Sequence, residues 1–113
     1  MNECLFCRIV SGDLPSHMVY EDDRVVVFKD IAAKAPVHLL IVPRKHIRDV
    51  ESASKADEGL VGHMFLTAAR VAEEAGVKAG GYRLVVNNGV DAGQVVFHLH
   101  LHLLGGKRLA GMG

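Results

Sequence analysis

The sequence carries no net charge and no long apolar run, and both shortages restrict what the protein can bind. Its 113 residues hold 13 Lys and Arg against 13 Asp and Glu. Without a basic surface to hold a phosphate backbone, we expect no nucleic-acid partner, although a pocket could still hold one free nucleotide. No apolar run approaches the roughly 20 residues that a membrane-spanning helix needs, so we expect no membrane partner either.

Cysteine is also scarce, because only two are present, as Cys4-x-x-Cys7 near the N-terminus. The opening stretch MNECLFCRIVSGDLP lacks a basic segment followed by a long apolar one, so we expect no signal peptide and a cytoplasmic protein. In such a chain the C-x-x-C spacing indicates a metal or redox pair before a structural disulfide.

Apolar residues, in contrast, make up 50% of the chain, which is enough for a hydrophobic core. The length fits a single domain over residues 1–113. Residues 107–113 have no hydrophobic pattern, and we expect this tail to be partly disordered.

The hydrophobic patterns predict an α+β fold: a five-stranded antiparallel sheet with one main helix and a short N-terminal helix. Short turns rather than helices join most of the predicted strands, which favours antiparallel pairing. The strands are predicted at 17–22, 24–30, 37–43, 81–88 and 95–104, the short helix at 3–11, a single helical turn at 44–50 and the main helix at 57–76.

The main helix has a predicted apolar stripe and predicted ends. Ser54 and Asp57 resemble a capping box, and Gly76 stands where a left-handed C-cap is favoured. One helical face gathers the apolar positions Leu60, Met64, Phe65, Ala68, Val71, Ala72 and Ala75.

The segment FHLHLHLL, residues 97–104, places His98, His100 and His102 at every second position, with leucines between them. Side chains alternate between the two faces of a strand, so the histidines should share one face and the leucines the other. Neighbouring histidines would then stand roughly 6.5–7 Å apart, which suits one reactive imidazole with a helper on each side better than a shared metal ion. The alternative is that they are ordinary solvent-facing residues of a strand.

Two flanking features favour a reactive site. Glycines at 89 and 93 in the loop NNGVDAGQ precede the histidines, and glycine lets backbone N–H groups approach a phosphate closely. The stretch Pro36-Val37-His38 brings a fourth histidine into the third predicted strand. By itself, NNG would indicate only a turn.

HLHLHLL resembles the signature of the histidine triad (HIT) family, His-φ-His-φ-His-φ-φ, where φ is apolar. The segments FKDI, APVHLLIVPRKHI, NNGVDAGQ and LGG are also similar to this family, and most of all to its Hint branch, the purine nucleoside phosphoramidases. The similarity runs from about residue 4 to about residue 106. It implies a HIT-like fold and a two-fold homodimer in which the main helix and one strand pair across subunits.

The resemblance implies a hydrolase that cleaves purine nucleoside 5′-phosphoramidates, which are AMP or GMP conjugates such as adenylyl-amines. His100 would be the nucleophile and would form a nucleotidyl-histidine intermediate, with one ring nitrogen held by the carbonyl of His98. His102 and His38 would assist at the phosphate. No cofactor is required for this chemistry.

Nucleotide contacts follow from the same resemblance. Asp30 would hold the ribose hydroxyls, and Asn87, Gly93, Gln94 and the backbone of Val95 would lie near the phosphate or the ribose. The apolar positions that would contact the base are Leu5, Phe6, Ile9, Leu14 and Ile31; their alternative is simple membership of the core.

Two departures from the Hint pattern are visible. Many relatives carry a serine directly after the Gly-Gln pair, where this chain has Val95. The serine hydroxyl is thought to help the departing amine, so we expect activity to survive with a lower rate or a shifted range of leaving groups. The tail also lacks the Trp-Pro-Pro ending that is common in this branch.

Some relatives bind structural zinc with a C-x-x-C pair and two histidines. Those positions resemble Cys4, Cys7, His46 and His98, whose two thiolates and two imidazoles would complete a tetrahedral shell. The alternative is a pair of free thiols beside a buried, hydrogen-bonded His46.

Two other functions stay open at this stage. One is hydrolysis of dinucleoside polyphosphates, as in a sister branch of the family, and the other is a nucleotide-binding adaptor whose chemistry is incidental. The LGG after the triad favours Hint, and a nucleophile accompanied by its helpers argues mildly against a pure adaptor.

Overall fold

The computed structural model describes residues 4–112, in which the chain forms a five-stranded antiparallel sheet with the strand order β1-β2-β3-β5-β4. Glu3 of the predicted N-terminal helix and the two ends of the predicted domain lie outside the described residues. The strands are β1 (Met18–Glu21), β2 (Val25–Lys29), β3 (Val37–Pro43), β4 (Tyr82–Val85) and β5 (Leu101–Gly105). The predicted α+β class and sheet are confirmed.

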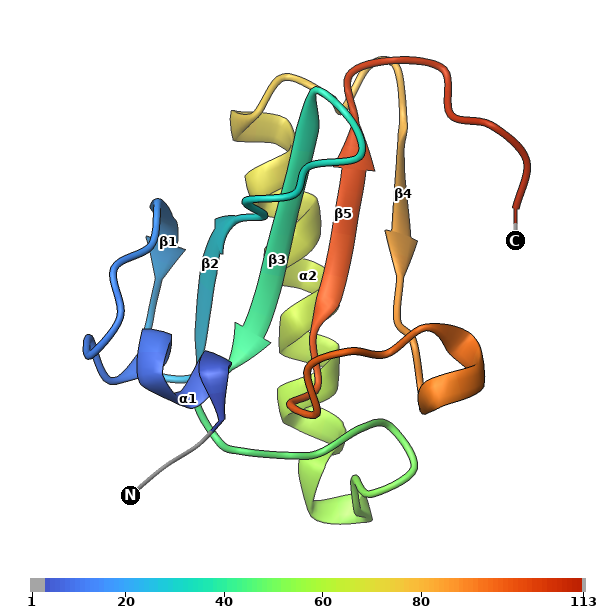
Figure 1. Ribbon diagram of the computed structural model, residues 1–113. Helices are drawn as coiled ribbons and strands as arrows, with labels where there is room; N and C mark the ends of the chain where they lie inside the picture. The colour runs from blue at the N-terminus through green and yellow to red at the C-terminus, as the bar shows by residue number, and fades with distance from the viewer. Residues whose placement is uncertain (1–3, 113) are drawn as a thin grey trace.

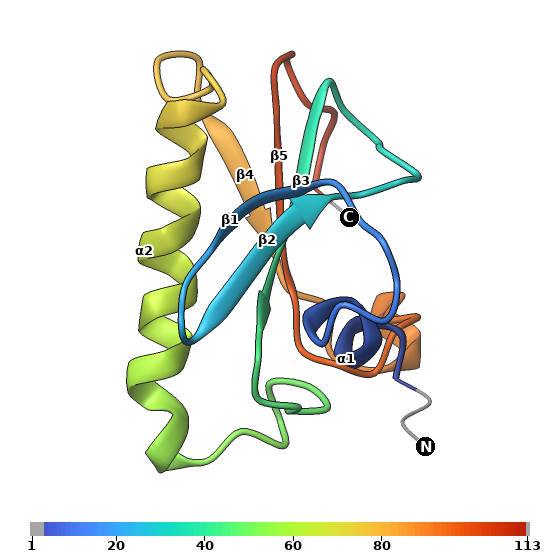
Figure 2. The same cartoon turned by 90° about the vertical axis from the view of Figure 1, so that its left-hand side faces the viewer.

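Two helices lie on opposite faces of the sheet (Figures 1 and 2). The short helix α1 (Leu5–Val10) lies on one face, and the long helix α2 (Glu58–Glu74) covers the other. In the described part of the chain, neither helix is long and apolar enough to cross a membrane.

Strand β3 supplies both hydrophobic layers, because its consecutive side chains point to opposite faces. Leu39 and Ile41 pack on the α2 side, in the same buried cluster as Met64 and Val71 of α2. Residues on the α1 side form a second buried cluster, whose members are Phe6, Val26, Phe28, Leu40 and Val42. The histidines of the candidate site lie on this α1 side, beside Phe6.

Helix α2 begins and ends as its sequence predicts. A 3₁₀ turn (Lys55–Asp57) precedes it, and the Asp57 carboxylate accepts the backbone N–H of Ser54 at 2.9 Å, as in a capping box. Gly76 has φ +80°, the left-handed conformation that glycine adopts without steric cost. Two positions of the predicted stripe are wrong, because Phe65 is 42% exposed and Ala75 is exposed just beyond the end of α2, whereas Thr67 is buried.

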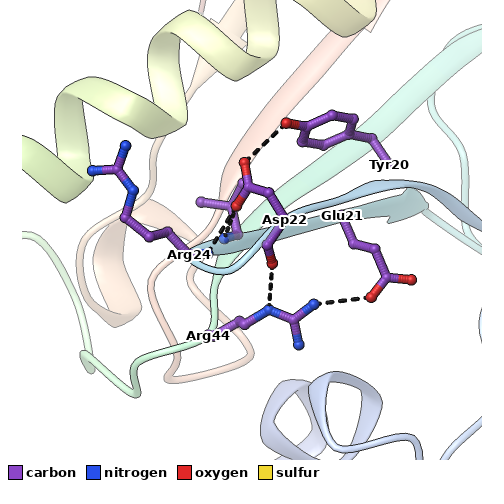
Figure 3. A network of polar contacts seen from close by, with 6 residues as sticks. Tyr20, Glu21, Asp22, Arg24 and Arg44 are labelled. Atoms are coloured by element: carbon purple, nitrogen blue, oxygen red, sulfur yellow. Dashed lines mark hydrogen bonds and ion pairs between the residues drawn. The ribbon is translucent and has the colours of Figure 1, made fainter.

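Asp22 organises the turn between β1 and β2 (Figure 3). Its carboxylate accepts the backbone N–H groups of Arg24 and Val25, both at 2.8 Å, and the hydroxyl of Tyr20 at 2.9 Å. His63 of α2 lies 2.7 Å from the same carboxylate. Burial raises the pKa of Asp22, but these hydrogen bonds outweigh it and hold the pKa well below its usual range. The turn is thereby tied to α2.

Arg44 ties the end of β3 to the same turn. Its Nε donates to the carbonyl of Asp22 at 2.7 Å, and its guanidinium contacts the Glu21 carboxylate at 2.9 Å (Figure 3). The segment 44–50 that follows is not the predicted helical turn; it runs as bends and irregular chain and reaches a turn at residue 50. Its carbonyl at Ile47 accepts the N–H of Leu99 at 2.6 Å, so the segment is held alongside the histidine stretch instead of coiling on itself.

Candidate active site

The histidine stretch enters the sheet later than predicted. The fifth strand was expected over 95–104, but β5 begins at Leu101, so only His102 of the three histidines lies in it. The prediction fails because the stretch before β5 bonds to the end of β3 and to the segment after it. The His98 ring reaches the Pro43 carbonyl at 2.8 Å, and the Leu99 N–H reaches the Ile47 carbonyl.

The leucines still face the core and the histidines still face α1. Leu99, Leu101 and Leu103 are at most 2% exposed and belong to the cluster on the α2 side. The rings of His100 and His102 stand 4.9 Å apart, centre to centre, which is closer than the spacing expected for a regular strand.

His100 has one ring nitrogen engaged. Its Nδ1 lies 2.7 Å from the carbonyl oxygen of His98, which can only accept, so Nδ1 carries the proton and Nε2 keeps its lone pair. Burial lowers the pKa of His100, so the ring is neutral at pH 7. Phe6 stands edge-on to this ring at 5.0 Å. The result is a fixed, neutral imidazole with an unshared electron pair at Nε2, which is the form that acts as a nucleophile.

His102 and His38 form a chain of contacts with Asp30. His38 Nε2 lies 3.0 Å from His102 Nδ1 and 3.3 Å from the Asp30 carboxylate. The other nitrogen of His38, Nδ1, accepts the backbone N–H of Lys34 at 3.0 Å. Burial lowers the pKa of His38 and, more strongly, that of His102, to about 4. Both rings are therefore neutral at pH 7.

A second group of side chains surrounds His98. The Cys4 Sγ and the Cys7 Sγ lie 3.3 and 3.4 Å from His98 Nδ1, and His46 Nδ1 lies 3.2 Å from both His98 Nδ1 and the Cys7 Sγ. All four atoms lie within 4.8 Å of one another. We refer to Cys4, Cys7, His46 and His98 as the Cys₂His₂ cluster.

The Cys₂His₂ cluster fits a tetrahedral metal ion. Zinc bonds of about 2.0–2.1 Å to nitrogen and about 2.3 Å to sulfur place ligand atoms about 3.3–3.8 Å apart, close to the separations observed. His98 Nε2 donates to the Pro43 carbonyl, which leaves Nδ1 unprotonated and turned toward the cluster, the usual arrangement of a metal-bound histidine. Burial raises the pKa of the Cys4 thiol, so its thiolate needs a cation beside it.

Asp30, His38 and His102 also bring three ligand-type atoms close together, but they do not fit a metal ion. The Lys34 N–H occupies Nδ1 of His38, so the proton of the neutral ring must sit on Nε2, the nitrogen that would have to bind the metal. A metal there would require an imidazolate or the loss of the backbone hydrogen bond. We interpret this group as a hydrogen-bond chain.

Comparison with known proteins places this geometry in a family. Residues 11–109 match the model of the HIT domain. The purine nucleoside phosphoramidase of Escherichia coli is 43% identical over 110 residues, which cover 97% of this chain and 92% of that protein. The crystal structure of a HIT family hydrolase from Legionella pneumophila superposes with a TM-score of 0.94 at 42% sequence identity, and the match covers 96% of each chain. The structure of a histidine triad protein from Clostridium difficile superposes with a TM-score of 0.96 at 40% identity, and the match covers 100% of this chain and 98% of that one.

The chain belongs to the HIT family.

The apolar positions of this HIT protein differ in exposure. Ile31, directly after Asp30, is fully exposed, so it is not a core residue. Leu5 is 46% exposed, whereas Ile9 and Leu14 are half-buried and Phe6 is buried against the His100 ring. Core membership is thus excluded for Ile31 and observed for Phe6.

In the loop before the histidines, the Gln94 side chain is buried and hydrogen-bonded within the protein. Gln94 is 5% exposed; its carbonyl oxygen accepts the Gly89 N–H at 2.7 Å, and its amide donates to the carbonyls of Arg48 and Val96. This side chain braces the loop from within. Val95 is 83% exposed, and Gly93 turns the chain there with φ +94°. Asn87 is half-buried in the segment that leads into this loop.

A cavity of about 360 Å³ borders this site, because Asp30 and His38 are among the residues that line it. Its wall also includes Val37 and Leu39 of β3, Val71 of α2 and Ala75 directly after α2, so it extends toward the α2 face of the sheet. His100 and His102 face α1, on the other side. We therefore do not assign a nucleotide to this cavity.

Some groups at the site were not predicted from the sequence. They are the Lys34 N–H and the carbonyls of Pro43 and Ile47, each of which holds part of the histidine arrangement. Every residue carries a backbone carbonyl, and every residue except proline carries a backbone N–H, so side-chain identity does not mark these groups. The one available signal was Pro43, which was recognised only as the end of a strand.

Proposed function

We propose that this HIT protein hydrolyses purine nucleoside 5′-phosphoramidates through a nucleotidyl-His100 intermediate, as expected of the Hint branch. The observation that carries the proposal is the 2.7 Å hydrogen bond from His100 Nδ1 to the His98 carbonyl, which leaves a lone pair at Nε2 of a neutral ring. The 43% identical relative named a purine nucleoside phosphoramidase supports the substrate class.

In the proposed first step, His100 Nε2 attacks the α-phosphorus, an N–P bond forms, and the bond from phosphorus to the amine breaks. The amine leaves with the bond's electron pair and takes up a proton. Water then attacks the nucleotidyl-histidine and releases the nucleoside monophosphate and the free imidazole. Negative charge grows on the phosphoryl oxygens during both attacks, so donors aimed at them supply the main electrostatic assistance.

His102 is the proposed donor of this kind. Its Nδ1 faces His38, so its Nε2–H is free to donate to a phosphoryl oxygen. The backbone around Gly93 and Val95 would add further donors, with Gln94 holding the loop in place. Because Val95 has no hydroxyl, we propose that the departing amine takes its proton from water.

The nucleoside would lie between Asp30 and α1. Asp30 Oδ1 accepts the N–H of Ala32 at 2.8 Å, and its carboxylate keeps lone pairs for two ribose hydroxyls. We propose that exposed Ile31 and Leu5 contact one part of the purine, with Ile9 and Phe6 beneath them. Asn87 is the proposed amide on the phosphate side.

We propose that the Cys₂His₂ cluster holds one zinc ion with a structural role. Two neutral imidazoles and two thiolates form a closed tetrahedral shell, which leaves no open position for a substrate. Bound zinc supplies a rigid junction among α1, the segment after β3 and the segment before β5. We also propose that the protein works in the cytoplasm, where thiols are kept reduced and can bind a metal.

A homodimer is proposed as the working form. β4 is at an edge of the sheet, with unpaired backbone groups along one side. On α2, Phe65 and Leu66 are 42% and 74% exposed, and a second subunit would cover them. Light scattering at micromolar concentration tests this, with a Leu66→Glu variant expected to shift the protein toward monomer.

The central experiment measures hydrolysis of an adenylyl-amine by the wild-type protein and by His100→Gln. We expect turnover and an AMP-sized mass adduct on the wild type after a rapid acid quench, and neither on the variant. His17→Gln, which changes an exposed histidine far along the chain, is the matched control. Preferential cleavage of a dinucleoside polyphosphate would favour the sister-branch activity, and AMP binding without turnover of either substrate would favour an adaptor.

A further inference from the structure

We propose that the backbone N–H of Lys34 sets the tautomers of His38 and His102, and so makes the outward nitrogen of His102 a donor. The consequence for phosphate binding rests on the proposed function; the tautomers themselves do not. Lys34 is therefore a positioning residue that acts through its main chain, and its side chain is exposed.

The assignment begins at the Lys34 N–H, whose role in the hydrogen-bond chain is fixed. A backbone N–H can only donate, and the Lys34 nitrogen lies 3.0 Å from His38 Nδ1. His38 Nδ1 must therefore be the unprotonated nitrogen of a neutral ring, and the proton must be on Nε2. This excludes one of the two tautomers of His38 without reference to any substrate.

The tautomer of His38 in turn fixes the tautomer of His102. His38 Nε2–H points at His102 Nδ1, 3.0 Å away, with the Asp30 carboxylate as a second acceptor at 3.3 Å. His102 Nδ1 is then the acceptor, and the proton of its neutral ring is on Nε2. Burial keeps both rings neutral at pH 7, so each holds one proton.

The loop between β2 and β3 is built to keep this N–H in place. Asp30 N donates to the His38 carbonyl at 3.0 Å, and the Asp30 carboxylate accepts the Ala32 N–H at 2.8 Å. These two bonds fold the loop back over the start of β3, which brings the Lys34 N–H within reach of His38. The same carboxylate that we propose to hold the ribose therefore also shapes the loop.

Without the Lys34 N–H, Nδ1 of His38 would be open to carry the proton, and the Asp30 carboxylate at 3.3 Å would be the one remaining contact in the described part of the chain that favours the proton on Nε2. With the proton on Nδ1, His38 Nε2 would become an acceptor, and His102 would donate to it from its own Nδ1. The outward Nε2 of His102 would then present a lone pair to a phosphoryl oxygen, and the two would repel. A single main-chain donor thus decides whether the site attracts or repels phosphate at this point.

The test uses ¹⁵N-labelled histidine and NMR of the ligand-free protein near pH 7.5, where the ring nitrogen shifts identify which atom carries the proton. We expect protonated Nε2 and unprotonated Nδ1 on both His38 and His102. Lys34→Pro removes the N–H and should give mixed tautomers at both rings. Lys34→Ala keeps the N–H and should retain the wild-type tautomers.

A kinetic readout accompanies the spectra. With an adenylyl-amine as substrate, Lys34→Pro should lower kcat by roughly tenfold to a hundredfold, with a smaller change in KM, because the lost donor acts mainly on developing charge. If wild-type His38 carries its proton on Nδ1, the inference is overturned whatever the activity, and no variant needs to fold for that result. Unchanged tautomers in a folded Lys34→Pro protein would overturn it as well. Expected tautomers together with no hydrolysis would instead reject the proposed function and leave this inference standing.

Discussion

Removing metal from the Cys₂His₂ cluster should lower the thermal stability of the protein. The cluster joins three separate stretches: the start of α1, the segment after β3 and the segment before β5. Helix α1 has only six residues, and isolated helices of that length are not stable in water. Its other main anchor is Phe6, which is 5% exposed. Losing the metal would therefore leave α1 held by the packing of Phe6, Ile9 and Val10 against the sheet.

The size of the effect follows from mass action. A ligand that binds only the folded state stabilises it by about 2.7 kcal/mol when its free concentration is 100 times its Kd. A change of 1 kcal/mol shifts Tm by roughly 4–8 °C in a domain of 60–100 residues and by less in larger ones. For a chain of 113 residues, we expect chelation to lower Tm by roughly 10 °C.

The assay compares thermal unfolding by circular dichroism with one equivalent of zinc and with excess chelator. His46→Gln should show no zinc-dependent shift, because it removes one ligand while disturbing little else at an exposed position. His17→Gln removes a histidine outside the cluster and should keep the full shift. If the wild-type Tm is the same in zinc and in chelator, and the purified protein carries less than about a tenth of an equivalent of zinc, this reasoning is refuted.

Three further predictions concern single side chains. Burial lowers the pKa of His102 to about 4 from an ordinary 6.5, so the unfolded chain takes up the proton first and stability is lost as the pH falls from 6.5 toward 4. Between pH 6.5 and pH 4, the free energy of unfolding measured with urea should therefore fall by roughly 3 kcal/mol less for His102→Gln than for the wild type. An equal fall in both proteins would contradict this prediction. Asp22→Asn should lower the free energy of unfolding by about 1.5–3 kcal/mol at pH 7, because it weakens four hydrogen bonds to a charged group. The difference from the wild type should shrink as the pH falls below about 4, where the carboxyl of the unfolded chain is protonated. A cost that is the same at pH 7 and at pH 3 would show that the charge is not the cause. Val95→Ser should raise the rate most for substrates with poor amine leaving groups, and an unchanged rate across a series of amines would show that a hydroxyl at this position is dispensable.

Local patterns predicted those parts of the protein that local chemistry decides. The alternating leucines identified core positions, because Leu99, Leu101 and Leu103 are all buried. Gly76 ends the main helix in the left-handed conformation that was predicted for it. The Cys4-x-x-Cys7 pair does lie beside two histidines, although its spacing alone did not determine which ones.

Contacts between distant segments decided the rest. The start of β5 moved to Leu101 because the preceding residues bond to the loop after β3, more than 50 positions earlier in the chain. The predicted helical turn at 44–50 is absent for the same reason. Phe65 has the right spacing for the core stripe of α2, but the sheet covers a slightly different face, on which Thr67 is buried instead. The tautomers of the site depend on main-chain groups, which a list of side chains does not reveal.

The alternation of leucine and histidine constrains how this segment can evolve. Deleting or inserting one residue between His98 and His102 would turn leucines toward α1 and imidazoles into the apolar layer beneath α2, because each side chain downstream would change sides. The hydrophobic core and the active site would both be disrupted by the same change. Homologues can therefore vary the identity of residues in this stretch, but a change in its length is expected to be lethal to the fold and to the reaction together.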